Sequence, residues 1–107
     1  MQYPFIIIMP ALKVNAMALF PFILVKEASF KHDEVLIRHE RIHLRQELEL
    51  LVIPFYVLYL FNYLVNLIWF KNHDRAYRNI IFEREAYTNE SIKGYLKKRK
   101  LWAWVKY

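Results

Sequence analysis

The sequence predicts an α+β fold, in which a small N-terminal β-hairpin or sheet packs on a mainly helical domain. Residues 3–25 are rich in Ile, Phe, Val and Leu and are interrupted by prolines, which is typical of short strands. Residues 34–51 interleave apolar and charged side chains with the period of a helix. Residues 50–70 carry no charge and are dominated by Tyr, Phe, Leu and Val, which indicates a second long helix.

The composition limits both the number of domains and the kinds of site. With 107 residues the chain is expected to form a single domain, residues 1–107, with one modest core. Its single glycine excludes glycine-rich phosphate loops and nucleotide-binding fingerprints. It has no cysteine, so disulfides and thiolate metal sites are excluded, and any zinc must be held by histidine and carboxylate side chains.

The N-terminal part predicts two strands, near residues 4–9 and 14–25, paired as a hairpin or lying in one small sheet. Pro21 lies inside the second strand and indicates an edge strand or a break, because proline cannot donate to a strand ladder. Residues 26–32 are expected to form a loop. The apolar run Phe5–Met9 is short and has no basic segment before it, so we expect no cleavable signal peptide.

The next elements are expected to be helices. Asp33 is a suitable cap for a helix that begins at Glu34, and Pro54 ends or kinks this helix. Residues 71–79 read as a polar connection with room for one helical turn. Residues 80–90 read as a further helix.

The uncharged residues 50–70 have two interpretations. They are long enough to cross a bilayer, and a buried core helix would show the same composition. Pro54, Asn62 and Asn66 argue against a membrane span, so a core helix is the first expectation and membrane insertion or interfacial attachment the alternative. Basic residues flank both ends, so their distribution gives no orientation.

The chain carries a net charge of +6, which can favour nucleic acid or anionic lipid headgroups, or simply belong to a soluble basic protein. The basic run Lys97–Lys100 precedes Trp102 and Trp104, a mixture that suits an anionic membrane surface. A solvated helix end or mobile terminus is the first expectation for this tail. No base-reading motif is visible, so we expect no specific nucleic-acid partner. We also expect a cytoplasmic location, which can be at the inner face of a membrane.

Residues 39–43 read His-Glu-Arg-Ile-His, which is an HExxH motif. His39 and His43 lie one turn apart on the same face of a helix, so both imidazoles can reach one Zn²⁺. Glu40 lies beside that position and can act on water at the metal. The motif therefore predicts zinc as cofactor, two histidine ligands and a catalytic glutamate.

A catalytic zinc site needs a third protein ligand. The residues that follow the motif lack the glycine and histidine of the extended HExxHxxGxxH pattern, so the ligand must come from elsewhere. Glu83 is the first candidate, because it shares a helix face with Ala86, whose small side chain allows close packing on the HExxH helix. Glu85 points to the opposite side and is the alternative. Glu47 is expected to be a solvated charge or an ion-pair partner.

HExxH followed by Glu-x-x-Ala at residues 83–86 resembles the gluzincin metallopeptidases, and the chain length resembles that of the minigluzincins. The resemblance implies that His39, His43 and Glu83 bind zinc, that Glu40 is the general base, and that the substrate is a peptide or protein. It also implies a small sheet beside the HExxH helix.

In such a fold the edge strand of the sheet binds extended substrate, and residues 14–25 are the candidate, with a purely structural hairpin as the alternative. Tyr87 departs from the family pattern, which often has Asp or Asn there to support an active-site histidine. Transition-state support could come from His73, which precedes Asp74, or from its rivals Tyr77 and Tyr87. For His73 a plain surface position is the more common case.

Two other functions are compatible with the sequence. The chain can be a non-catalytic relative that keeps zinc as a structural clamp or serves as a binding module. It can also be a small membrane-associated protein in which the HExxH motif is coincidental and residues 50–70 carry the function.

Overall fold

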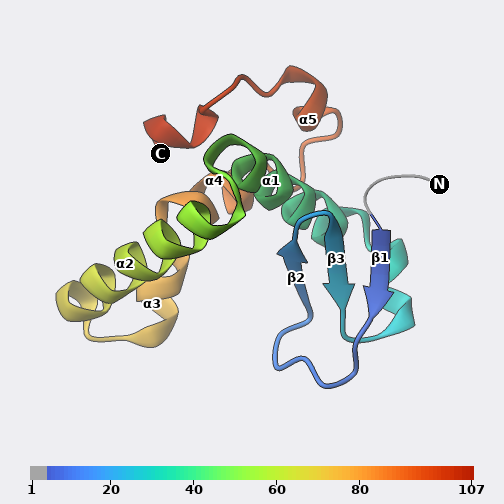
Figure 1. Cartoon of the computed structure of the whole chain (residues 1–107), viewed down its shortest axis with the longest axis horizontal. Helices are drawn as coiled ribbons and strands as arrows, with labels where there is room; N and C mark the ends of the chain where they lie inside the picture. Colours follow the sequence, from blue (N-terminus) through green and yellow to red (C-terminus); the bar gives the residue numbers. More distant parts are fainter. Residues whose placement is uncertain (1–4) are drawn as a thin grey trace.

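The computed structural model of the chain describes residues 5–107 and has the α+β fold that the sequence predicts (Figure 1). Three short strands form one sheet: β1 (Phe5–Ile8), β2 (Ala16–Leu19) and β3 (Phe22–Val25). The order is β1-β3-β2, with β1 parallel and β2 antiparallel to β3. β2 thus has one edge that pairs with no other strand of this sheet.

The predicted strand at residues 14–25 is two strands. Of the two expectations for Pro21, the break is correct: the cis bond between Phe20 and Pro21 lies in the turn between β2 and β3. β3 is consequently the central strand, and β2 is an edge. The strand predicted near residues 4–9 corresponds to β1, with residue 4 outside the described residues.

The sheet rests on the first long helix, α1 (Glu34–Leu50). Apolar side chains of β2 and β3, Ala18, Ile23 and Val25, form a buried cluster with Leu44 of this helix. The side chain of Asp33 accepts a hydrogen bond from the Leu36 N–H at 3.0 Å, which confirms the predicted cap. Residues 26–32 were expected to be a loop, but they contain the 3₁₀ helix η1 (Ala28–His32).

α1 ends at Leu50. The next residue, Leu51, has a positive φ of 66°, and α2 (Val52–Phe70) starts directly after it. Pro54 lies in the first turn of α2, where its missing N–H leaves no helical hydrogen bond unmade. The two helices form a V (Figure 1).

α2 is not the buried core helix of our first expectation, because Phe55 is its single buried residue. Among the described residues it is the one helix that is long and apolar enough to cross a membrane. Its inner face carries Asn62, whose side chain accepts the Ile81 N–H at 2.8 Å, and Asn66, which donates to the Ala76 carbonyl at 3.1 Å. These two amides therefore dock the following helices on α2.

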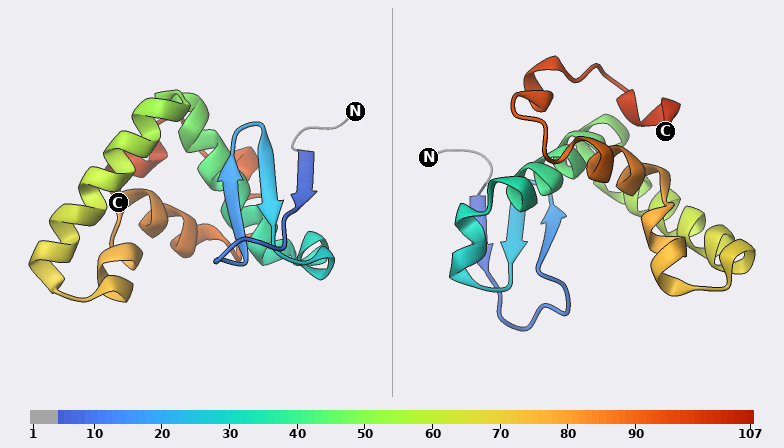
Figure 2. Two further views of the ribbon diagram at one scale, coloured as in Figure 1. Left: turned by 60° about the horizontal axis from the view of Figure 1, so that its bottom comes forward. Right: turned by 180° about the vertical axis from the view of Figure 1, so that it is seen from behind.

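The remaining helices are α3 (His73–Arg78), α4 (Ile81–Asn89), α5 (Tyr95–Lys98) and the 3₁₀ helix η2 (Ala103–Lys106). The first two correspond to the helical turn and the helix predicted over residues 71–90. The C-terminal tail runs back over α1 and α4 (Figure 2).

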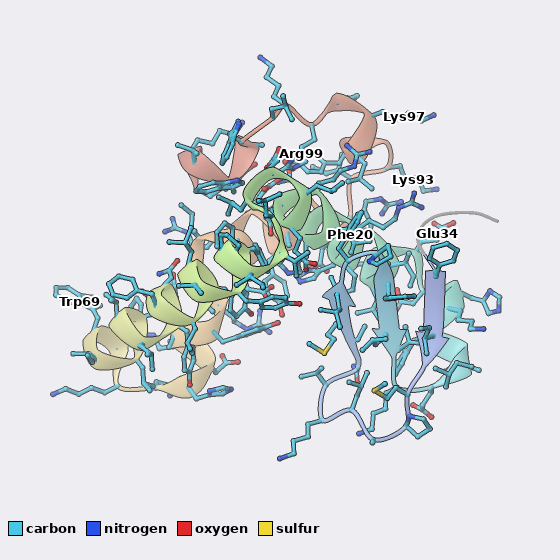
Figure 3. All side chains as sticks on the ribbon, viewed as in Figure 1. Phe20, Glu34, Trp69, Lys93, Lys97 and Arg99 are labelled. Atoms are coloured by element: carbon cyan, nitrogen blue, oxygen red, sulfur yellow. The ribbon has the colours of Figure 1, made fainter. Side chains whose placement is uncertain are left out.

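The expectation of a solvated helix end or mobile terminus is wrong for Arg99, whereas its neighbours Lys97, Lys98 and Lys100 are exposed. The Arg99 side chain is 2% exposed, and its Nε donates to Glu85 at 2.6 Å while its Nη1 donates to Glu49 at 2.8 Å (Figure 3). The indole of Trp104 packs edge-on against the Phe82 ring at 5.1 Å between centroids. Burial of an ion pair and an indole fixes the tail on the domain.

Candidate metal centre

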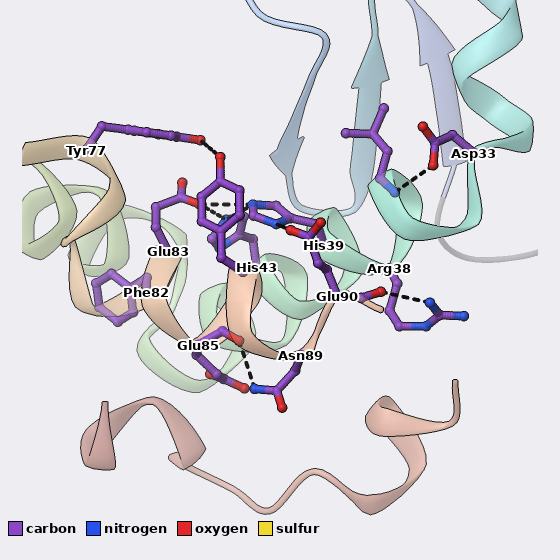
Figure 4. Close-up of polar contacts among 12 residues, drawn as sticks. Asp33, Arg38, His39, His43, Tyr77, Phe82, Glu83, Glu85, Asn89 and Glu90 are labelled. Carbon is purple, nitrogen blue, oxygen red and sulfur yellow. Dashed lines mark hydrogen bonds and ion pairs between the residues drawn. The ribbon is translucent and has the colours of Figure 1, made fainter. Parts of the chain in front are cut away.

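Three side chains that can bind a metal converge where α4 crosses α1 (Figure 4). His39 and His43 project from α1, and Glu83 projects from α4. Glu83 Oε1 lies 2.9 Å from His39 Nε2 and 3.0 Å from His43 Nε2, and the two Nε2 atoms are 3.2 Å apart. All three residues are buried, at 5%, 5% and 3% exposure. This group can hold a metal ion.

The packing of α4 on α1 brings Glu83 to the histidines. Ala86, one turn after Glu83, is fully buried, as its small side chain predicts. Gln46 of α1 ties the helices together, because its amide nitrogen donates to the Phe82 carbonyl at 3.1 Å and to Glu85 Oε1 at 2.9 Å. The sequence thus positions the third ligand by helix packing rather than by a loop.

Hydrogen bonds behind the histidines set their tautomers. Because the Gln46 amide nitrogen is occupied by two acceptors, its oxygen faces His43 Nδ1, at 2.8 Å, and that nitrogen must carry the proton. His39 Nδ1 likewise faces Glu90 Oε1 at 2.9 Å. Both Nε2 atoms then present lone pairs to the shared point, which is the tautomer that a metal-binding histidine needs.

The donor set fits a divalent cation. Two imidazole lone pairs and a carboxylate oxygen within 3.2 Å of one another repel unless a positive charge lies between them. Without a metal, a proton fills this role: burial lowers the pKa of His43, but the Glu83 carboxylate outweighs burial and raises it to about 10. Burial raises the pKa of Glu83, but in the metal-free protein the charge on His43 and its hydrogen bond to Glu83 bring it well below its usual range.

Glu40 lines a cleft beside His39, His43 and Glu83. A cavity of about 200 Å³ is lined by Glu40, His43 and Glu83, by β2 and by the start of α2. An adjoining groove of about 680 Å³ shares Glu40 and extends past His39. Burial raises the pKa of Glu40, and the charges of His43 and His39 partly oppose this. A carboxylate with a raised pKa beside a metal group can both accept and return a proton.

The three candidates for transition-state support occupy different positions. His73 is exposed at the start of α3, where Nδ1 pairs with the Tyr63 hydroxyl at 2.7 Å, and it lines only the larger groove. The Tyr87 ring packs edge-on against the His39 ring at 4.6 Å, and its hydroxyl donates to the Tyr77 hydroxyl at 3.4 Å. Tyr77 lines both cavities. Of the three, Tyr77 is best placed to reach a group bound at the cleft.

Two other glutamates have roles that differ from ligation. Glu85, the alternative ligand, lies away from the triad, with no exposed side-chain surface, and binds Arg99. Burial raises the pKa of Glu85, but hydrogen bonds from Arg99, Tyr95 and Gln46 bring it below its usual value. Glu47 was expected to be solvated or ion-paired, and this is wrong. It is fully buried, and its Oε1 accepts the Phe20 N–H at 2.8 Å.

Residues that support the ligands are the ones that sequence reasoning missed. Gln46 and Glu90 hold the two histidines, and the Tyr59 hydroxyl donates to Glu83 Oε2 at 2.6 Å. His39 is therefore supported by Glu90, although Tyr87 stands where the family pattern often has the Asp or Asn that supports an active-site histidine. Spacing could have found two of them: Gln46 lies one turn after His43, and Glu90 lies two turns after Glu83.

Comparison with known proteins adds no assignment. No protein-family model, no curated protein and no solved structure matches the chain. The interpretation of this site consequently depends on its own geometry and chemistry, and on the likeness of residues 39–43 and 83–86 to the gluzincin pattern.

Proposed function

We propose that the protein is a zinc-dependent peptidase that hydrolyses a peptide bond with water. The observation that carries the proposal is the convergence of His39, His43 and Glu83 beside Glu40 in a cleft. Two imidazoles and one carboxylate are a common protein ligand set of catalytic zinc. When bound, zinc supplies a Lewis acid that polarises the substrate carbonyl and lowers the pKa of water.

Glu40 is the proton carrier in this proposal. Its carboxylate removes a proton from the attacking water and gives it to the nitrogen of the leaving amine. Burial supports this role because it raises the pKa of Glu40 above its ordinary value. Glu40 lies beside the helix face that carries the two histidines and lines the same cavity as His43 and Glu83, so it is next to the candidate ligand atoms.

Tyr77 is the donor proposed for the developing negative charge on the carbonyl oxygen. Its hydroxyl lies 3.4 Å from the Tyr87 hydroxyl, which is longer than a strong hydrogen bond between hydroxyl groups, so its proton can turn towards the cleft. Burial and the charge of Glu83 raise the pKa of Tyr77 well above its usual value, so the phenol stays protonated. A preorganised donor of this kind stabilises an oxyanion.

The free edge of β2 is the proposed site for the substrate backbone. The Asn15 carbonyl accepts the Lys26 N–H, so in the antiparallel ladder the backbone groups of Ala16 and Ala18 point away from β3. The Tyr56 hydroxyl donates a hydrogen bond to the Ala18 carbonyl. The backbone N–H and carbonyl of Ala16 remain to pair with an added strand. Ala16 and Ala18 line the cavity beside Glu40. An extended peptide paired here lies across the ligand group.

The test is hydrolysis of a quenched-fluorescent peptide library by zinc-loaded protein. Glu40→Gln is expected to retain zinc and to lose hydrolysis by at least about 100-fold, because the amide cannot take a proton. Glu34→Gln, at the exposed start of the same helix, is the matched control and is expected to hydrolyse like wild type. Hydrolysis by Glu40→Gln at the wild-type rate would contradict the catalytic role.

A second function is a zinc site that stabilises the fold without turnover. The burial of all three candidate ligands favours it, because structural sites are closed to solvent. It predicts one zinc per chain, a large loss of stability in chelator, and no hydrolysis of the library by wild type.

A further inference from the structure

α2 has two unlike faces, and one of them is uncovered. The inner face carries the buried Phe55 and the half-buried Tyr59, Asn62 and Asn66. The outer face carries large apolar side chains spaced three or four residues apart, ending in an adjacent pair: Ile53, Val57, Phe61, Leu64, Ile68 and Trp69. Ile53 and Ile68 are each 77% exposed and Trp69 is 80% exposed. Continuous apolar surface of this kind marks a site of interaction.

The position of α3 excludes a simple span by α2. Asn66 of α2 donates to the Ala76 carbonyl, so α3 lies alongside the C-terminal half of α2. α3 exposes Asp74 and Arg78, whose side chains are 73% and 58% accessible. A spanning α2 would place these charges in the hydrocarbon, at a cost of several kcal/mol. A helix lying in the plane of a membrane surface would bury only its outer face.

Cations surround the far end of this face. A groove of about 470 Å³ runs between α2 and α4, with Ile68, Trp69 and Phe70 on one side and Arg84 on the other. Lys71 follows α2 directly, and the Arg75 guanidinium lies over the Phe70 ring at 5.0 Å. Trp69 lies at this end of the helix (Figure 3). Apolar side chains next to cations match the acyl chains and anionic headgroups of a membrane surface.

The overall charge agrees with such a surface. Glu40, Glu47, Glu83 and Glu85 are buried, so the accessible surface is more basic than the formal charge of +6. Anionic lipid attracts each of the cations around the apolar face and at the same time offers an apolar layer to the side chains of the outer face.

We propose that the outer face of α2 binds anionic membranes, with the helix lying in the membrane plane and its apolar side chains at the boundary of headgroups and acyl chains. α2 is about 28 Å long, so this contact spans much of the domain. Its inner face lines the cleft through Phe55, Tyr56 and Tyr59. The cleft is therefore held roughly 10 Å, one helix diameter, from the lipid. The proposal does not depend on the metal.

Vesicle flotation of the full chain tests the proposal. Wild type is expected to float with vesicles of phosphatidylcholine and phosphatidylglycerol, mixed at about 3:1, and to bind pure phosphatidylcholine more weakly. Binding to the anionic vesicles is expected to fall as the salt concentration rises. Ile53→Ser/Ile68→Ser is expected to lower the partition coefficient at least about tenfold, because each side chain loses apolar area that the lipid buries. Leu48→Ser/Ile92→Ser is the control, since both residues are exposed but lie outside α2.

A spectroscopic readout separates lipid contact from a structural effect. Anionic vesicles are expected to shift the tryptophan emission of wild type to shorter wavelength, and Trp69→Phe is expected to reduce that shift. The proposal is overturned if wild type does not float, if the α2 variant floats like wild type, or if both vesicle types bind equally. It is also overturned if wild type forms a lipid-independent dimer that the α2 variant abolishes, because a second copy would then cover the face.

Discussion

At the scale of single residues, Glu47 shows how burial makes a carboxyl group depend on its protonation state. Its Oε1 accepts the Phe20 N–H, whereas its Oε2 has no hydrogen-bond partner among the described residues. Burial raises its pKa to about 7, although the Phe20 N–H and the charge of His43 oppose the shift. The folded protein therefore favours the protonated form, and the stabilising contribution of this group is complete below the unfolded pKa near 4.5 and lost as pH rises through 7.

Glu47→Gln removes this dependence. The variant is expected to be more stable than wild type at pH 8 by about 1–3 kcal/mol, and the difference is expected to shrink below about 1 kcal/mol at pH 5. Urea unfolding at both pH values measures this, with Glu27→Gln, an exposed glutamate, as control. A variant that is less stable than wild type at pH 8 would show that the ionised carboxylate is needed.

Residues of the site differ in how well the sequence predicts them. The spacing of His39 and His43 is sufficient to predict a shared ligand group, because both sit on one helix face. The choice of Glu83 follows from its face shared with Ala86. The burial of Glu47 could not be predicted, because it depends on the β2–β3 turn folding over α1, which is a contact between distant segments.

At the scale of elements, the same limit applies. Helical periodicity and a capping aspartate predict α1 from residue 34. The amide pair on α2 indicates a polar face of that helix, but the spacing does not predict its partners. Asn62 and Asn66 argue against a span, yet their partners are backbone groups of later helices rather than solvent. The tail is expected to be a solvated helix end or a mobile terminus because it is the end of the chain. The partners of Arg99 could not be predicted, because they lie 14 and 50 residues away in the sequence.

The tail contact leads to a prediction about stability. Arg99→Met leaves the buried carboxylates of Glu85 and Glu49 without their cation, so the free energy of unfolding is expected to fall by about 3–5 kcal/mol. Lys98→Met changes an exposed neighbour and is expected to stay within about 0.5 kcal/mol of wild type. Equal stability of the two variants in urea unfolding would mean that the tail does not hold the domain together.

At the scale of the whole molecule, one helix separates two surfaces. The inner face of α2 forms a wall of the cleft beside His39, His43 and Glu83, and its outer face is an uncovered row of apolar side chains. β2, an edge strand of the sheet, also lines this cleft through Ala16, Met17 and Ala18. The proposed peptidase site and the proposed lipid contact thus use opposite faces of α2, and each can be disrupted without the other.

The central claim is that His39, His43 and Glu83 form a zinc site, and the metal content of purified protein tests it most directly. Elemental mass spectrometry after zinc loading and desalting is expected to find about one zinc per wild-type chain and little in Glu83→Ala, with Glu34→Ala unchanged as control. Zinc retained by Glu83→Ala at the wild-type level, or absent from wild type after loading, would contradict the three-ligand site.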